Sequence, residues 1–187
     1  MRVILISGKA EAGKSLTAHI LKEKFESDGL RCCIVPYGDY VKSTARLLWD
    51  WDGSKDEYGR QILQYWGTEM VRAKHPTFWV DTVKRLADVI EPDFDYLIID
   101  DCRFPDEIEA WNNWVKLTVR VERPGHENAL SPSQRVHTSE TALDDYPFAV
   151  RLVATTKEAL VNEIQEKLIP VLNERRTSYE YHGPSGT

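Results

Sequence analysis

Residues 8 to 15 read Gly8-Lys9-Ala10-Glu11-Ala12-Gly13-Lys14-Ser15 and match the phosphate-binding pattern G-x-x-x-x-G-K-[ST]. The apolar run Val3-Ile4-Leu5-Ile6 directly before it predicts a buried strand, and the stretch after Lys14 predicts an amphipathic helix. A glycine turn that contains a lysine by chance is the alternative. The strand before the motif and the helix after it favour a P-loop instead.

Each part of this loop has a chemical task. Backbone N–H groups in the loop and at the start of the helix point at a phosphate and stabilise its charge. Gly8 and Gly13 allow dihedrals that a Cβ would forbid. Lys14 is expected to reach the β- and γ-phosphates of a nucleoside triphosphate, and the Ser15 hydroxyl to bind Mg²⁺. The residues expected around the ATP phosphates are Gly8, Ala10, Glu11, Ala12, Gly13, Lys14, Ser15 and Leu16.

Length and charge limit the classes of function. The 187 residues suit one domain with inserted segments. The formal net charge of −6, without a long Lys/Arg run, argues against polymeric nucleic acid as a partner, because a polyanion needs a basic face. The apolar start is too short for a secretory signal, and no run has transmembrane length. We therefore expect a cytoplasmic protein that binds small nucleotides and has no membrane partner.

Strands and helices alternate along the rest of the chain. Further strands are predicted at four apolar runs, over 31–35, 96–99, 116–121 and 148–153. Helices are predicted between them, the first ending near Asp28-Gly29, several over 39–90 around a loop at 50–59, and a short one over 104–114. The sequence therefore predicts an α/β fold, a three-layer sandwich around a parallel sheet of about five strands.

The last helix has the clearest pattern. Thr155-x-x-Glu158 reads as a capping box at its start. Its apolar positions repeat every four residues, at Leu160, Ile164, Leu168 and Leu172. Pro170 is expected to kink the last turns, and the polar sequence beyond Glu174 is expected to be a loose tail.

The cysteines and most tryptophans are expected to be structural. Cys32, Cys33 and Cys102 have neither disulfide nor zinc spacing, and Cys32 and Cys33 should point to opposite faces of a strand. Four tryptophans fall on apolar helix faces, which favours core packing: Trp49, Trp66, Trp111 and Trp114. Within the helical stretch 39–90, the apolar residues Val41, Leu47 and Leu48 mark the first helical segment.

Two neighbouring carboxylates end the strand over 96–99. In a parallel α/β sheet, ligands bind at the carboxyl ends of the strands. Asp101 is the expected second anchor for Mg²⁺ beside Ser15, and Asp100 is the competing candidate. Successive strand residues point to opposite faces, so only one of the two should face the nucleotide. Capping the next helix is the other role open to Asp101.

A polar stripe follows within the helical segment. Arg60, Gln64 and Arg72 are spaced by four or eight residues and would share a face of one continuous helix, although Gly67 could break it. Arginines so placed can grip a phosphate with two hydrogen bonds, and a glutamine amide can pair with a base edge. A solvated helix face explains the same spacing.

Longer motifs add a family resemblance. They occur in the order P-loop, Leu63-Gln64-x-x-Gly67-Thr68-Glu69-x-x-Arg72, Trp79-Val80, Asp101-x-Arg103-Phe104-x-x-Glu107 and His137-x-Ser139-Glu140-x-x-Leu143. From about residue 3 to 172, the chain resembles the phage-type deoxynucleoside monophosphate kinases, which belong to the nucleoside monophosphate kinase fold of P-loop NTPases. It departs from them at Lys9 and Glu11, where small residues are usual, and at Pro105-Asp106.

The resemblance implies a division of the chain into parts. A single kinase domain over 1–187 would have its core at 1–38, 91–122 and 147–176. Helices over 39–90 would bind the acceptor, 123–146 would form a lid, and 177–187 a polar tail. The acceptor site would include Asp39, Arg60, Gln64, Thr68, Arg72 and Trp79. The catalytic residues would be Lys14, Arg103 and the lid arginines Arg123 and Arg135, although either lid arginine could be a surface charge.

The implied reaction is transfer of the γ-phosphoryl group of ATP to a deoxynucleoside 5′-monophosphate, with Mg²⁺ on the donor phosphates. The acceptor phosphate is already anionic, so positioning and charge neutralisation should matter more than a general base. The alternatives are a kinase of the same fold acting on dephospho-coenzyme A or phosphomevalonate, and a P-loop switch that is not a kinase. A homodimer is left open, and a phage-encoded protein would work in the host cytoplasm.

Overall fold

The centre of the molecule is a five-stranded sheet. The computed structural model describes residues 1–54 and 56–180, and in it the strands have the order β2-β3-β1-β4-β5. All four neighbouring pairs are parallel. The strands are β1 (Arg2–Ser7), β2 (Cys32–Ile34), β3 (Tyr96–Cys102), β4 (Lys116–Glu122) and β5 (Val150–Val153). The predicted α/β fold with about five parallel strands is therefore confirmed.

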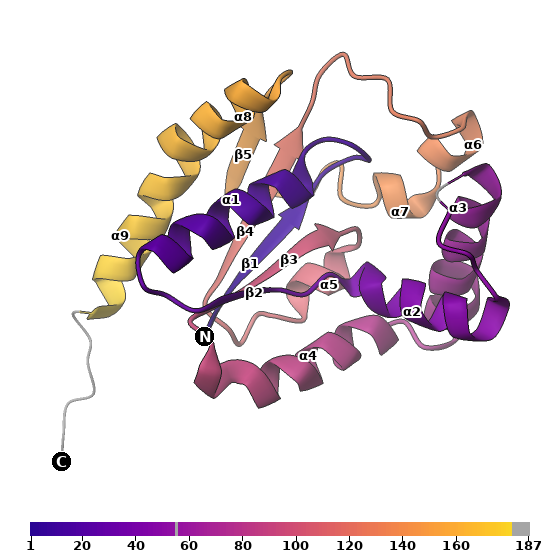
Figure 1. Ribbon diagram of the computed structural model, residues 1–187, viewed down its shortest axis with the longest axis horizontal. Helices are drawn as coiled ribbons and strands as arrows, with labels where there is room; N and C mark the ends of the chain where they lie inside the picture. Colours follow the sequence, from indigo (N-terminus) through magenta and orange to yellow (C-terminus); the bar gives the residue numbers. More distant parts are fainter. Residues whose placement is uncertain (55, 181–187) are drawn as a thin grey trace.

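Helices cover both faces of this sheet (Figure 1). One face packs against α1 (Lys14–Ser27), α8 (Lys157–Glu163), the π-helical turn η3 (Ile164–Leu168) and α9 (Ile169–Glu180). The other face packs against α2 (Tyr37–Trp49), α4 (Phe78–Ile90) and α5 (Pro105–Glu109). The short helices α6 (Pro132–Arg135) and α7 (Thr138–Thr141) follow β4, and η2 (Glu91–Asp93) precedes β3. In the described part of the chain, no helix has the length and apolar character needed to cross a membrane.

The segment between β2 and β3 is helical, as expected. Beyond α2 it contains α3 (Glu57–Gln64), which continues into the π-helical η1 (Tyr65–Arg72), and then α4. The Asp56 carboxylate caps α3 by accepting the Gly59 N–H at 2.7 Å, so Gly59 belongs to the helix and not to the loop predicted over 50–59. Residue 55 of that loop lies outside the described residues.

The end of α2 is more exposed than its apolar sequence suggests. Leu47 is 79% exposed, Leu48 60% and Trp49 44%, so the predicted core packing of Trp49 is wrong. The helix instead turns Tyr37 and Ala45 inward. Its last turn still contacts η1, because the Trp49 ring meets those of Tyr65 and Trp66, and periodicity alone does not show which apolar side chains such contacts cover.

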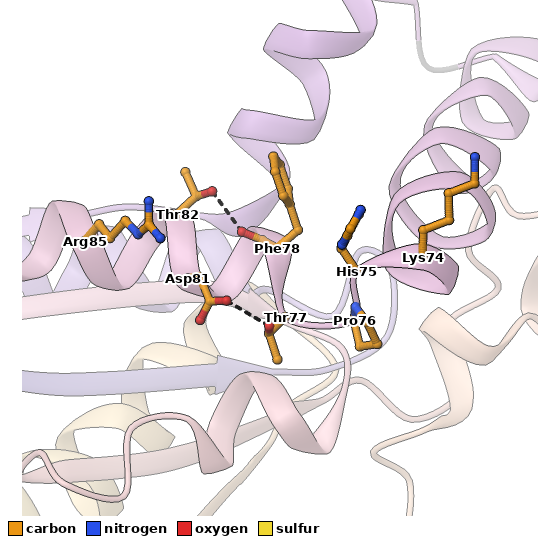
Figure 2. A pocket seen from close by; sticks show the side chains of 8 residues that line it. All are labelled: Lys74, His75, Pro76, Thr77, Phe78, Asp81, Thr82 and Arg85. Carbon is orange, nitrogen blue, oxygen red and sulfur yellow. Dashed lines mark hydrogen bonds between the residues drawn. The ribbon is translucent and has the colours of Figure 1, made fainter.

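A hollow of about 330 Å³ lies where η1 is connected to α4 (Figure 2). Its wall includes Lys74, His75 and Arg85. The hydroxyls beside them are used within α4, because Thr77 donates to the Asp81 carboxylate and Thr82 to the Phe78 carbonyl, each at 2.8 Å. This hollow is lined by the helical segment and lies apart from the P-loop residues that define the site below.

The two faces of the sheet alternate residue by residue. Cys32 packs in the core on the α1 side, while Cys33 packs against the opposite core, as predicted. Both are free thiols. Along β3, Ile98 faces the α1 side and Ile99 the α2 side. The alternation is interrupted after Ile99, because the register of β3 against β1 shifts there and Cys102 packs in the same core as Ile99.

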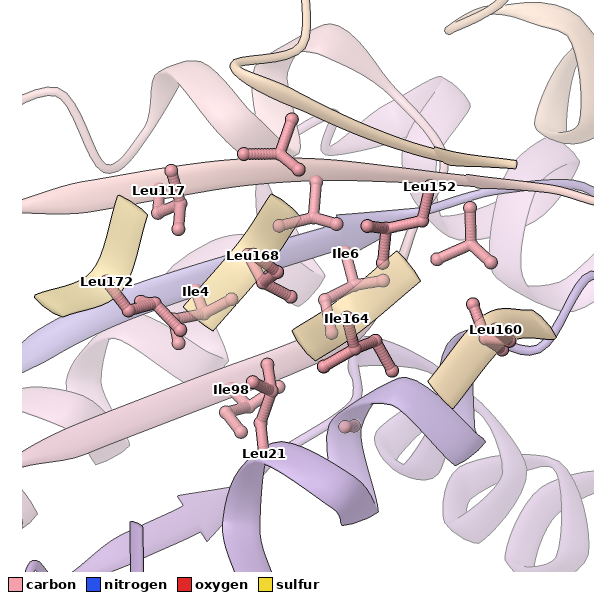
Figure 3. Packing of buried hydrophobic residues seen from close by; sticks show 14 of the residues in the cluster. Ile4, Ile6, Leu21, Ile98, Leu117, Leu152, Leu160, Ile164, Leu168 and Leu172 are labelled. Atoms are coloured by element: carbon pink, nitrogen blue, oxygen red, sulfur yellow. The ribbon is translucent and has the colours of Figure 1, made fainter. Parts of the chain in front are cut away.

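The predicted four-residue repeat of the last helix is confirmed. Leu160, Ile164 and Leu168 are each at most 3% exposed and Leu172 is 6% exposed. Figure 3 shows them as a row facing strand residues that include Ile4, Ile6 and Leu152. Trp111 is also fully buried, as predicted.

Three details of the C-terminal helix differ from expectation. Its N-cap is Thr156, whose hydroxyl accepts the Ala159 N–H at 3.1 Å, so the predicted capping box at Thr155 and Glu158 is wrong by one residue. The π-helical turn η3 ends two residues before Pro170. Because a proline has no N–H to donate, it interrupts the α-helical hydrogen bonds, and a π-helical turn accommodates this interruption. The helix continues to Glu180, past the predicted start of the tail, and 181–187 lie outside the described residues.

Two leucines test this arrangement. Leu168→Ala should lower the free energy of unfolding by about 2–5 kcal/mol, because it leaves a cavity between η3 and the sheet. Leu47→Ala should change it by no more than about 0.5 kcal/mol, because that side chain is exposed. Urea denaturation of both variants measures the difference. A large loss for Leu47→Ala would contradict the described position of α2.

Candidate active site

The P-loop connects β1 to α1 at the carboxyl edge of the sheet. Gly8 (φ 154°) and Gly13 (φ 107°) adopt backbone conformations that suit glycine. A Cβ on Gly8 would lie 2.3 Å from the Val121 carbonyl oxygen, and one on Gly13 would lie 2.6 Å from a methyl carbon of Leu160. The loop is therefore pressed against β4 and α8, and both glycines are required by close approach.

Lys14 lies across its own loop. Its ammonium donates to the carbonyl oxygens of Gly8 at 2.8 Å and Lys9 at 2.7 Å. Burial lowers the pKa of Lys14 to about 8, and the nearby charge of Arg103 acts in the same direction. The carboxylates of Glu140, Asp101 and Asp100 act in the opposite direction. Lys14 is thus affected by charges from two other segments, the end of β3 with Arg103 and the short helix that carries Glu140.

Asp101 is engaged by the start of α2. Its two carboxylate oxygens accept the Tyr37 N–H at 2.9 Å and the Gly38 N–H at 2.7 Å. Burial raises the pKa of Asp101 despite these bonds. The carboxylate therefore caps a helix, which was the alternative role considered for it, but the helix is the preceding α2 and not the next one.

Asp100 differs from its neighbour. It follows Ile99 at the register shift of β3, and it is 5% exposed. Among buried side-chain atoms of the described residues, its Oδ1 is one of three that have no hydrogen-bond partner. A buried carboxylate oxygen without a donor is unfavourable unless a cation or a ligand compensates it. Of the two aspartates, Asp100 is the one with an oxygen available at this edge of the sheet.

Arg103 and Glu140 meet beside the loop. The Arg103 guanidinium donates to the Glu140 carboxylate, and also to the Ser139 carbonyl oxygen at 3.1 Å. The other oxygen of Glu140 accepts the Ala10 N–H of the P-loop at 3.2 Å. The Glu140 side chain is 4% exposed and that of Arg103 37%. In the sequence, Glu140 stands out only as part of a motif, and the motif predicts no role for it.

The unusual charged residues of the P-loop both bind the segment after β4. The Lys9 ammonium donates to the Glu140 carbonyl oxygen at 2.5 Å and to Asp144 at 2.7 Å. The Glu11 carboxylate pairs with His126 at 3.0 Å, and this bond is the main reason that the pKa of Glu11 is lowered. The two departures from the family pattern therefore connect the loop to 126–144.

Arg120 was missed by sequence reasoning. It lies on β4, is 5% exposed, and donates to the Ser7 hydroxyl at 3.1 Å and to Asp144 at 2.9 Å. The only signal was the strand pattern Lys116 to Glu122, in which polar residues alternate with apolar ones and arginine takes an inward position. Arg120 and Lys9 together hold Asp144 in place.

Arg72 is bound to α5. Its guanidinium contacts both oxygens of Asp106 at 2.7 and 2.8 Å and Glu107 at 3.3 Å, and it lies 3.9 Å from the centre of the Phe104 ring. Burial raises the pKa of Glu107 to about 7, while the Arg103 N–H that it accepts at 2.6 Å acts in the opposite direction. In this structure Arg72 joins η1 to α5.

The predicted polar stripe is divided. Gly67 does not break the helix, but the π-helical turn of η1 changes the angle between Arg60 and Arg72. Arg60 lies near the P-loop, since its charge contributes, after His126, to lowering the pKa of Glu11. Gln64 and Thr68 are half-buried between them.

Four other predicted residues lie away from the loop or have protein partners. Trp79 is 3% exposed and its indole N–H donates to the Gly67 carbonyl at 3.0 Å. Asp39 is exposed and pairs with Lys42 at 2.7 Å. Arg123 donates to the Thr155 carbonyl at 3.2 Å, and Arg135 to those of Leu130 at 2.9 Å and Asn128 at 3.0 Å.

A cavity of about 390 Å³ lies between the P-loop and the end of β4. Its lining includes Lys9, Ala12, Arg120, Arg123 and His126. The segment predicted as a lid forms one wall, but its second half is packed: Leu143 is 2% exposed and belongs to the core under α4 and α5. The second half of this segment is therefore anchored in the core.

No protein-family model matches the sequence, and no curated protein matches it either. The structure is similar to that of an APS kinase from Mycobacterium tuberculosis in complex with AMPPNP and APS, with 14% identity, a TM-score of 0.48 and 92% of this chain and 97% of that one covered. It is also similar to a shikimate kinase from Bacteroides thetaiotaomicron, with 14% identity, a TM-score of 0.45 and 91% and 98% covered.

The lowered pKa of Lys14 predicts a pH limit for binding a triphosphate. Lys14 is charged below pH 8 and loses its proton as the pH rises through about 8. The affinity for ATP should therefore be constant below this pH and fall by up to about tenfold per unit above it. Titration of ATP between pH 6.5 and 9.5 measures this. Lys14→Met should bind more weakly and lack this pH dependence; equal slopes for both proteins would contradict it.

Proposed function

We propose that the protein transfers the γ-phosphoryl group of ATP to a deoxynucleoside 5′-monophosphate. The observation that supports phosphoryl transfer best is the position of Arg103 beside the P-loop, where its guanidinium binds Glu140 and Glu140 accepts the Ala10 N–H. A P-loop lysine with a second cation at its side provides the two positive charges that a transferring phosphoryl group needs. The motifs at Gly67 to Arg72 and at Asp101 to Glu107 supply the choice of acceptor.

The P-loop would bind the donor. The N–H groups of the loop and of the start of α1 would surround the β-phosphate, and Lys14 would exchange its two loop carbonyls for phosphate oxygens. This exchange is favourable because a hydrogen bond between two charged groups is stronger than one to a neutral carbonyl. The cavity beside Ala12 and Arg123 offers room for the rest of the nucleotide.

The residues present fit a Mg²⁺ ion. Ser15 is exposed at the start of α1, and Asp100, near the end of the neighbouring strand β3, has an unpartnered buried oxygen. The described residues contain no group of three His, Cys, Asp or Glu that could hold a metal. Mg²⁺ is commonly held by one or two protein oxygens, with water and substrate phosphates as the other ligands. When bound, it would neutralise charge on the donor phosphates. We assign the carboxylate ligand to Asp100 in place of Asp101.

The acceptor would lie along α3 and η1. Arg60 and Gln64 on α3 are half-buried, and so is Thr68 on η1, one turn further along. Arg60 would contact the monophosphate and Gln64 the base. Arg72 would act indirectly, because its bonds to Asp106 and Glu107 hold α5 and hence Arg103, whose N–H binds Glu107.

A panel of acceptors tests the proposal. ATP, Mg²⁺ and each deoxy- and ribonucleoside monophosphate, together with dephospho-coenzyme A, phosphomevalonate, adenosine 5′-phosphosulfate and shikimate, are assayed for ADP release. We expect release to depend on a deoxynucleoside monophosphate and to be lost in Lys14→Ala. Such a loss is typically about 10²- to 10³-fold for one preorganised donor. Turnover only with another acceptor, or slow hydrolysis with none, would contradict the proposal.

The metal assignment gives a paired prediction. Asp100→Asn should raise the Mg²⁺ concentration that gives half-maximal activity by about tenfold or more, because it removes a carboxylate ligand. Asp101→Asn should leave this concentration nearly unchanged and lower the thermal stability, because it weakens the cap on α2. Mg²⁺ titrations and melting curves of both variants measure the two effects. The opposite ranking of Mg²⁺ requirement would return the role to Asp101.

A further inference from the structure

A short segment after the expected lid reaches back to the P-loop. The segment comprises α7 (Thr138–Thr141) and the turn to Asp144. His137 fixes its start, because its Nδ1 accepts the Ser139 N–H at 3.2 Å. Leu143 fixes its end in the core, where it is 2% exposed. The segment is therefore held at both ends, and the carboxylates of Glu140 and Asp144 lie at defined positions.

The two carboxylates have different partners. Glu140 binds the Arg103 guanidinium and the Ala10 N–H. Asp144 binds Lys9 and Arg120. Glu140 is almost completely buried, whereas the Asp144 side chain is 40% exposed. Only Glu140 connects a residue that follows β3 to the phosphate-binding loop that follows β1.

This contact restricts Arg103. An arginine side chain has many rotamers and loses conformational entropy when it is held in one of them. The Ser139 carbonyl and the Glu140 carboxylate hold the guanidinium from one side, at the level of Ala10. A charged partner that is itself buried and fixed gives a well-defined geometry. Protein contacts alone therefore hold Arg103 beside the P-loop.

We infer that Glu140 is a positioning residue, which holds Arg103 where it meets the γ-phosphoryl group of ATP. The identity of the transferred group rests on the proposed function. Glu140 does not touch the phosphate in this role. Its carboxylate faces the guanidinium and a loop amide, and the guanidinium provides the charge that the phosphoryl group meets. The part of Arg103 that is exposed, 37% of its side chain, is available for this contact.

A double-mutant cycle tests the inference. The variants are Glu140→Gln, Arg103→Lys and the double variant, with kcat and the KM of ATP as readouts. Glu140→Gln should lower kcat by about 10- to 100-fold and change KM by less than about threefold, because the orientation of Arg103 matters most in the transition state. In the Arg103→Lys background, Glu140→Gln should lower kcat by less than about twofold more, because the group that it positions is already gone.

Two controls separate positioning from stability. Asp144→Asn removes the other carboxylate of the segment, and its effect should multiply with that of Arg103→Lys. Glu158→Gln, at an exposed position of α8, should leave kcat unchanged. If Glu140→Gln does not fold, Glu140→Asp replaces it in the cycle, since it keeps the charge and shortens the side chain. Melting curves identify a folded variant.

A second readout does not need the acceptor. ATP and ADP differ by the γ-phosphate, so the ratio of their dissociation constants measures the contacts to that group. Glu140→Gln should reduce the preference for ATP by about three- to tenfold in the wild-type background and not in Arg103→Lys. If no acceptor supports turnover but this ratio is coupled, the proposed function fails and the inference stands.

Other outcomes would overturn the inference. Equal effects of Glu140→Gln in both backgrounds would show that Glu140 acts independently of Arg103. Tighter ATP binding by Glu140→Gln with unchanged kcat would show that the carboxylate competes with phosphate for the Ala10 N–H. In either case the contact between Glu140 and Arg103 would not position the arginine for catalysis.

Discussion

The site depends on the compensation of charges that are brought close together at one edge of the sheet. Four cationic side chains lie around the P-loop: Lys9, Lys14, Arg103 and Arg120. Removing so many neighbouring charges from water is unfavourable unless each has a polar partner. Glu140 and Asp144 provide carboxylate partners for Lys9, Arg103 and Arg120 from a single short segment, while Lys14 donates to two carbonyl oxygens of its own loop. The same compensation fixes the backbone, because Lys9 and the Ala10 N–H bind this segment directly. The loop that receives the phosphate is thus held by charges of both signs.

The strand order makes this meeting of distant residues possible. In the order β2-β3-β1-β4-β5, the strand that leads into the P-loop has β3 on one side and β4 on the other. Parallel strands end at the same edge, so Asp100 and Arg103 arrive from one side and Arg120 from the other. The chain that leaves β4 then returns over the loop and delivers Glu140. A mixed sheet would send one of these groups to the opposite edge.

Sequence reasoning succeeded where the signal is local. The apolar runs at Val3 to Ile6 and Tyr96 to Ile99 specify buried strands, and the repeat from Leu160 to Leu172 specifies a buried helix face. It failed where the answer depends on packing. Trp49 was expected in the core but is 44% exposed at the end of α2, and the π-helical turn of η1, which periodicity does not reveal, changes the angle between Arg60 and Arg72. Asp100 and Asp101 could be distinguished only once their hydrogen-bond partners were known.

A phosphate that binds an arginine of the site must replace the partner that this arginine now has, and these partners differ. Arg123 and Arg135 bind neutral backbone carbonyls and are exposed, so an anionic phosphate is a stronger partner than those they now have. Arg103 and Arg72 bind carboxylates, and removing such a partner would leave a charge uncompensated. An exchange of partners is therefore more favourable at Arg123 and Arg135 than at Arg103 and Arg72. The carboxylates that bind Arg103 and Arg72 hold these two guanidinium groups in place.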